Sequence, residues 1–218
     1  MAVSPFYNDA GFDRVAAFYD PLSRLVFGRS LQRAQQRALA YLPTGSPHVL
    51  LVGGGTGWVL PELLRLRPQA QVLYLEASPE MLRQAQETLR RQAPQHMGQV
   101  EFRLGTEAAL APQEQFDAVL TFFLLDLFAP ARLHELVQRL NRARRPQAPW
   151  LVADFAPPRA WWQHALLKAM YWFFGFTTGI SGRQLPDIRA ALAGVGLLAG
   201  PAQSGYGGMV EAVVFHPA

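Results

Sequence analysis

Residues 48–58, HVLLVGGGTGW, combine an apolar run with a glycine-rich turn. The run Val49–Val52 is continuously apolar, which is typical of a strand buried on both faces of a parallel sheet. The glycines after it allow a tight turn and a close approach of backbone N–H groups to a ligand. Helical spacing begins directly afterwards, at Val59, Leu60, Leu63 and Leu64. A strand, a glycine turn and a helix in this order predict an α/β fold with a ligand site at the turn.

The spacing of the glycines separates several classes of ligand. Gly53, Gly55 and Gly57 give the pattern G-x-G-x-G, whereas a dinucleotide fingerprint would need a glycine at the position of Trp58. No Gly-Lys-Ser/Thr follows, so a phosphate-binding P-loop is excluded. A second apolar run ends in Glu76, 23 residues after Gly53. A carboxylate about 20 residues beyond the turn is where ribose hydroxyls bind in a βαβ nucleoside site.

Apolar runs and helical patterns alternate through most of the chain. We expect strands at 48–52, 71–76, 100–104, 118–124 and 150–154, and helices over 12–41, 58–66, 79–92 and 131–142. This alternation predicts βαβ units and a parallel sheet. The strand-like segments 196–202 and 209–216 are joined by a link that is too short for a parallel crossover, so they are expected to pair antiparallel.

These segments together resemble the class I S-adenosylmethionine-dependent methyltransferases. The resemblance covers about residues 12–155 and rests on VLLVGGGTG, YLEASPEML, VEFRLGTEAAL and FDAVLTFFLLDLF. The N-terminal FDRVAAFYDPLSRLVF is similar to the lead-in of the quinone-biosynthesis C-methyltransferases. Leu51 and Thr106 stand where family members often have Asp. The resemblance implies a Rossmann-like α/β fold: a seven-stranded, mostly parallel sheet with helices on both faces and an antiparallel C-terminal strand.

The resemblance also implies S-adenosylmethionine as the cofactor. The implied cofactor-binding residues are Tyr19, Gly53, Gly55, Thr56, Gly57, Glu76, Ala77, Thr106, Glu107 and Phe122. Methyl transfer from a sulfonium depends mainly on positioning and on exclusion of water, and a base is needed only if the acceptor loses a proton. Asp126 and Asp154 are the predicted catalytic residues, ahead of His164, because ligands of open α/β sheets bind beyond the carboxyl ends of strands. No metal-ligand spacing is present.

Composition narrows the choice of partner and location. The length of 218 residues favours one domain, with an N-terminal helical cap over 1–47 and a lid or acceptor segment over 157–185. Cysteine is absent, so disulfides and thiolate sites are excluded. The net charge of +4 comes from scattered arginines, so we do not expect a nucleic-acid partner. The sequence shows neither a leader nor an apolar span of about 20 residues, which favours a cytoplasmic location.

The segment WWQHALLKAMYWFFGF, residues 161–176, is rich in aromatic residues and apolar around most of a helix. It could cover the edge of the sheet, close over a hydrophobic acceptor, or contact a membrane surface. We therefore predict a small, apolar acceptor that is quinone-, lipid- or aromatic-like, and we leave the oligomeric state open.

Two alternatives to a methyltransferase remain. The first is a non-catalytic S-adenosylmethionine-binding protein of the same fold. The second is an aminopropyltransferase, since GGGTG resembles the GGGDG loop of spermidine synthases. That activity needs an acidic loop after the fourth strand, where this chain has FFLLDLF.

Overall fold

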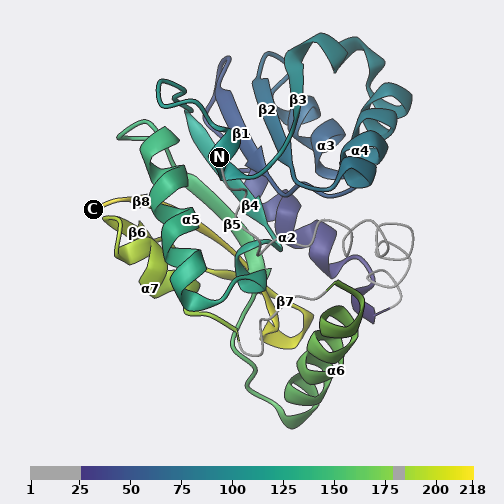
Figure 1. Cartoon of the computed structure of the whole chain (residues 1–218), viewed down its shortest axis with the longest axis vertical. Coiled ribbons are helices and arrows are strands. Elements are labelled where there is room, and N and C mark those ends of the chain that lie inside the picture. The colour runs from purple at the N-terminus through teal and green to yellow at the C-terminus, as the bar shows by residue number, and fades with distance from the viewer. Residues whose placement is uncertain (1–25, 179–184) are drawn as a thin grey trace, which may run out of the picture.

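The computed structural model describes residues 26–178 and 185–218, which are organised around one eight-stranded sheet (Figure 1). The strand order is β3-β2-β1-β4-β5-β8-β6, and β7 pairs with β8. The strands are β1 (His48–Val52), β2 (Gln71–Glu76), β3 (Val100–Leu104), β4 (Ala118–Phe122), β5 (Trp150–Phe155), β6 (Leu197–Ala199), β7 (Gln203–Gly205) and β8 (Val210–Pro217). Strands β1 to β5 pair in parallel, and β8 is antiparallel to each of its neighbours.

Six α-helices and four short 3-10 helices connect these strands in the described ranges. The α-helices are α2 (Ser30–Leu39), α3 (Val59–Leu66), α4 (Pro79–Gln92), α5 (Pro130–Ala143), α6 (Trp161–Thr178) and α7 (Ile188–Ala193). The 3-10 helices are η1 (Pro94–Gln99), η2 (Glu107–Ala109), η3 (Leu125–Leu127) and η4 (Tyr206–Gly208). None of the helices described is both long enough and apolar enough to cross a membrane.

Two apolar layers lie on opposite faces of the sheet. Successive side chains of a strand point to opposite faces, so Val49 and Leu51 of β1 join one layer while Leu50 and Val52 join the other. Helices α2, α3 and α4 cover the first face, and α5 and α7 cover the second. The apolar β1 sequence is therefore explained by burial on both sides.

Local sequence signals account for several element boundaries. Helix α4 begins at Pro79 because Ser78 accepts a hydrogen bond from the Met81 N–H (3.1 Å), an N-cap contribution of about 1 kcal/mol. Strand β4 ends two residues earlier than the prediction because Phe123 adopts a left-handed backbone conformation, with φ of 52°. Gly28, with φ of 57°, interrupts the helical segment expected over 12–41, shortly before α2 begins at Ser30.

The predicted fold class is confirmed, and the details at the C-terminus differ from the prediction. The sheet has eight strands rather than seven because residues 203–205, expected to be part of a link, form β7 against β8. Helix α7 was not predicted from its short run of small residues, and its N-cap is Asp187, which accepts from the Ala190 N–H (2.9 Å). Strands 196–202 and 209–216 pair antiparallel as predicted, as β6 and β8.

Candidate cofactor and acceptor site

The turn after β1 depends on glycines for two different reasons. Gly55 and Gly57 have φ values of 62° and 81°, a region that side chains strongly disfavour. A Cβ on Gly57 would lie 2.6 Å from the Cα of Ala85, so the turn packs directly against the backbone of α4. A Cβ on Gly55 would have no protein atom within 4 Å. The space in front of Gly55 is therefore open to a ligand, whereas Gly57 is required by packing.

Glu76, the last residue of β2, connects this turn to the start of α4. Its Oε2 accepts from the Gly55 N–H and its Oε1 from the Ser78 N–H, both at 3.0 Å. The hydroxyl of Tyr74 donates to the Gly55 carbonyl (2.8 Å) and holds the turn in place. The side chain of Glu76 is 7% exposed. A positioned carboxylate thus lies beside the open face of the glycine turn, at the carboxyl ends of β1 and β2.

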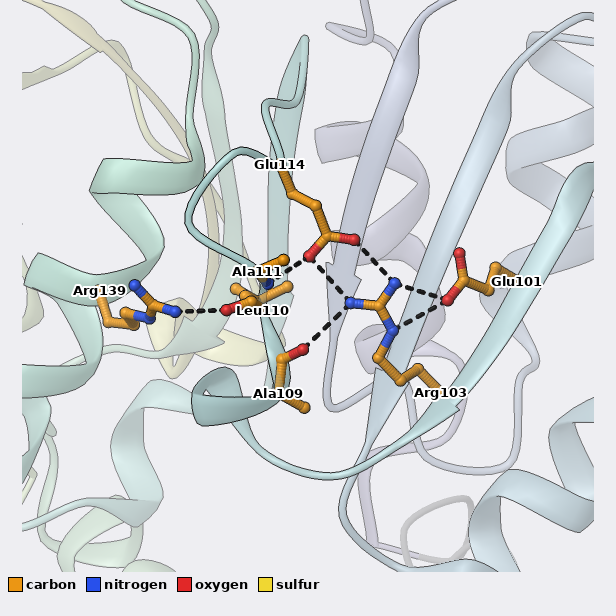
Figure 2. A network of polar contacts seen from close by, with 7 residues as sticks. All are labelled: Glu101, Arg103, Ala109, Leu110, Ala111, Glu114 and Arg139. Carbon is orange, nitrogen blue, oxygen red and sulfur yellow. Dashed lines mark hydrogen bonds and ion pairs between the residues drawn. The ribbon is translucent and has the colours of Figure 1, made fainter.

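The segment after β3 is held between the sheet and α5 by arginines (Figure 2). Arg103 donates two hydrogen bonds to Glu114, at 2.7 and 2.9 Å, and two more to Glu101. Arg139 donates to the carbonyl of Leu110. The Arg103 guanidinium lowers the pKa of the Glu114 carboxyl. These contacts fix the path of residues 105–114, which carry the predicted positions Thr106 and Glu107.

Those two residues have structural roles within this segment. The Thr106 hydroxyl accepts from the Ala108 N–H (3.4 Å) and begins η2. The carboxylate of Glu107 forms an ion pair with Arg132 of α5. These contacts fix the backbone of residues 106–109 and the position of the Glu107 carboxylate.

Two buried carboxyl groups lie at the carboxyl ends of β4 and β5. Asp126 and Asp154 are 5% and 1% exposed, and each carboxyl affects the pKa of the other. Burial raises the pKa of Asp126 to about 6, and burial together with the charge of Asp126 raises the pKa of Asp154 well above its usual range. Both predicted catalytic residues therefore belong to one interacting pair of buried carboxyls, and the pKa of each is raised above its ordinary value.

The two carboxyls differ in their backbone contacts. Asp154 accepts from the Leu125 N–H (3.1 Å) and from the Phe155 N–H (2.8 Å), so both of its oxygens are bonded. Asp126 Oδ1 is the one buried side-chain nitrogen or oxygen without a hydrogen-bond partner in the described parts of the chain. An unpartnered buried acceptor is costly, and a ligand hydroxyl is one group that would satisfy it.

A row of aromatic rings runs from the end of β4 to α6. Phe123 contacts Phe155 at 5.4 Å between centroids, Phe155 contacts Phe27 at 5.3 Å, and Phe27 contacts Tyr206 at 5.1 Å. Trp162 of α6 completes the row, 6.0 Å from Tyr206. Phe123 and Tyr206 have φ of 52° and 50°, a strained conformation that is frequent at functional sites. The row lies on the face of the sheet that α2 to α4 cover, at the carboxyl ends of β4 and β5.

The remaining predicted residues lie in different settings. Phe122 is buried in the core layer of α2 to α4, and Ala77 is half-buried directly after Glu76. Thr56 borders a surface depression between the turn and the outer side of α4. His164 is exposed on α6, and its Nδ1 lies 3.0 Å from the Ala160 carbonyl. Tyr19 lies outside the described residues.

Sequence reasoning missed Phe123, Phe155 and Tyr206 as site residues. They carry no motif, and only the fold brings them together from three separate segments. Position 123 lies at the end of the predicted strand 118–124, and position 155 directly follows the predicted strand 150–154. This placement at strand ends is the one signal that could have found them.

The strand order, the antiparallel β8 and the groups at the carboxyl ends of β1 and β2 define a Rossmann-like methyltransferase fold. The mitomycin 7-O-methyltransferase MmcR has a similar structure (TM-score 0.71, 22% identity, covering 95% of this chain and 60% of that chain). So does an O-methyltransferase family protein from Burkholderia thailandensis (0.68, 18%, 97% and 59%). The SAH-bound form of CalO1, a methyltransferase in calicheamicin biosynthesis, is a third (0.67, 19%, 93% and 57%).

Identities at this level establish the fold alone, and the chain spans about three fifths of the length of these three structures. Residues 49–147 match the family model described as methyltransferase domain. This match covers less than half of the chain, and it agrees with the methyltransferase fold that the structure and its neighbours share. A search of curated protein sequences finds no match.

Proposed function

We propose that the chain transfers a methyl group from S-adenosylmethionine to a small aromatic or quinone-like acceptor that carries a hydroxyl group. The observation that carries this proposal is the contact of Glu76 with Gly55, which places a fixed carboxylate beside an open turn. A carboxylate there can accept from both hydroxyls of a ribose. S-adenosylmethionine, when bound, supplies a methyl group on a positively charged sulfur.

The aromatic row supports an apolar acceptor. Phe123, Phe155 and Tyr206 form a wall at the carboxyl ends of β4 and β5, next to the proposed cofactor site. Aromatic walls favour flat, apolar rings over charged acceptors, and they exclude water from a displacement reaction. Trp162 extends this wall, so the acceptor would enter beside α6, in agreement with a lid or acceptor segment over 157–185.

The carboxyl pair supports an acceptor that loses a proton. In an in-line displacement the acceptor oxygen bonds to the methyl carbon as the carbon–sulfur bond breaks, and the hydroxyl proton must leave. Burial raises the pKa of both Asp126 and Asp154, so each carboxylate is a stronger base than an exposed aspartate would be. We assign Asp126 as the group that takes the proton, because its Oδ1 has no partner, and Asp154 as the residue that positions it.

The names of similar structures agree with an oxygen acceptor, since two of those described above are O-methyltransferases. Methylation of carbon in a quinone, as the N-terminal resemblance suggests, is the alternative acceptor chemistry. The helical cap over 1–47 and a cytoplasmic location stay predictions within this proposal. So do the cofactor contacts of Tyr19, Gly53, Thr56, Gly57, Ala77, Thr106, Glu107 and Phe122.

The test has two stages. Calorimetry with S-adenosylmethionine is followed by incubation with methyl-labelled cofactor and a panel of phenols, quinols and polar amines. We expect labelled product from phenols or quinols only. Binding without product from any of them would favour the non-catalytic alternative, and labelled amines would contradict the apolar acceptor.

The proposed role of Asp126 in proton transfer is tested with one variant. Asp126→Asn is expected to keep cofactor affinity and to lose most turnover of hydroxyl acceptors. The pH dependence of the rate that arises from titration of Asp126 and Asp154 should also disappear. Unchanged turnover and an unchanged pH dependence would remove Asp126 from the mechanism.

A further inference from the structure

Within residues 161–169, whose side chains the structure describes, helix α6 is anchored to the rest of the chain by one side. Gln163 donates to the Gly207 carbonyl (2.9 Å), and its amide oxygen accepts from the Arg159 and Ala160 N–H groups (2.6 and 3.1 Å). Leu167 is buried in the same core layer as α2. Figure 1 shows the helix standing at one end of the molecule, away from the sheet. This placement leaves the opposite side of the helix uncovered by the described chain.

The outward face of α6 combines a large apolar side chain with basic groups. Trp161 is 82% exposed, the highest exposure among the large hydrophobic residues described. Ala165, Lys168 and Ala169 are also exposed, and their spacing from Trp161 places them on the same side of the helix. We call Trp161, Ala165, Lys168 and Ala169 the outer face.

The charged residues around the outer face are basic. Residues 155–186 contain no acidic residue, and Arg159 and Lys168 are both exposed. Neither forms an ion pair with any residue that the structure describes, although eight other arginines there do. Lys168 is also the one lysine of the chain. The basic groups at this face are thus left for an external partner.

We propose that the outer face docks the protein on an anionic lipid surface. Trp161 would insert at the level of the headgroups, where the amphipathic indole ring is favoured, and Arg159 and Lys168 would contact lipid phosphates. The polar His164 and Lys168 in the first half of the helix suit a helix that lies in the interface plane. This inference does not depend on the proposed methyl transfer.

A second copy of the chain fits this face less well. A symmetric contact between two outer faces would bring Arg159 and Lys168 near their own copies, with no acidic residue in the segment to offset the repulsion. Anionic lipid provides the missing opposite charge. The two occupants differ in their response to vesicles, so one experiment separates them.

The test is co-flotation of the full chain with vesicles at low salt. Mixed phosphatidylglycerol and phosphatidylcholine vesicles are expected to bind it, and phosphatidylcholine alone much less. Trp161→Ser should weaken binding about ten-fold by removing exposed apolar area. Lys168→Gln should weaken it about five-fold and reduce its salt dependence. Leu198→Ser, which removes another exposed apolar residue (59%) on β6, should bind like the unmodified chain.

Cofactor affinity and the thermal unfolding midpoint are expected to stay the same in all three variants, which shows that the fold is intact. The proposal is overturned if the unmodified chain does not bind anionic vesicles. Equal binding of Trp161→Ser and Leu198→Ser also overturns it. A dimer that dissociates in Trp161→Ser, without vesicle binding, would assign the outer face to a second copy instead.

Discussion

Replacing Asp126 by Asn should change how the stability of the protein depends on pH. The amide keeps the shape of the side chain and can donate to Asp154, but it does not titrate. In the unmodified chain, burial raises the pKa of Asp126 from 3.8 to about 6. A shift of this size corresponds to about 3 kcal/mol of free energy.

The direction of the change in stability with pH depends on whether the folded or the unfolded state binds the Asp126 proton more tightly. The folded chain keeps the Asp126 proton between about pH 4 and about pH 6, where the unfolded chain has released it. The stability of the unmodified chain therefore falls as the pH rises through this window, and the contribution is fully present below it. Asp126→Asn removes this loss, so its stability relative to the unmodified chain should rise by about 3 kcal/mol from pH 4 to pH 7.

The measurement is urea unfolding of both proteins followed by circular dichroism at several pH values. Asp154→Asn is the matched control, because one oxygen that accepts a backbone N–H would be replaced by an NH2 donor. That variant should be less stable by about 1–3 kcal/mol at neutral pH. A free-energy difference between Asp126→Asn and the unmodified chain that is constant with pH would refute the raised pKa of Asp126.

Two further predictions concern the segments that frame the site. Arg103→Leu should lower the free energy of unfolding by about 1–2 kcal/mol at neutral pH, measured by denaturant titration. Glu114 has a lowered pKa, so this loss should vanish in acid as Glu114 protonates; a loss that persists there would contradict the ion pair. Gly57→Ala should lower the unfolding midpoint far more than Gly55→Ala, because its Cβ meets Ala85. Gly55→Ala should mainly lose cofactor affinity, and the reverse order would mean that both glycines only form the turn.

The sequence predicts the central parallel strands well because their side chains are buried on both faces. Strands at 48–52 and 71–76 match the structure to the residue, since a largely apolar run is sufficient to identify such a strand. The edge strand at 100–104 also matches, although its sequence VEFRL alternates apolar and charged residues and is only partly buried. The start of α4 follows from Ser78 and Pro79 in the same way. Strand β7 could not be predicted, because its QSG sequence has no apolar pattern and forms only by pairing with β8.

The candidate site could also be predicted from the sequence only in part. The position of Glu76 beside the glycine turn follows from its sequence offset, because β1 and β2 are paired neighbours. The contact between Asp126 and Asp154 does not, since the two lie on separate strand ends and each could equally bond to nearby backbone. The left-handed Phe123 has no sequence signal either, because β-branched and aromatic residues ordinarily favour the extended backbone.

The most direct test of the account is the affinity for S-adenosylmethionine, measured by titration calorimetry, of the unmodified chain and of Glu76→Ala. The account predicts one bound cofactor per chain and, in Glu76→Ala, at least a hundred-fold weaker binding, about 3 kcal/mol for two hydrogen bonds to a charged group. Thermal unfolding of the variant should remain cooperative, which separates lost binding from lost folding. Equal affinities in the two proteins would contradict the account.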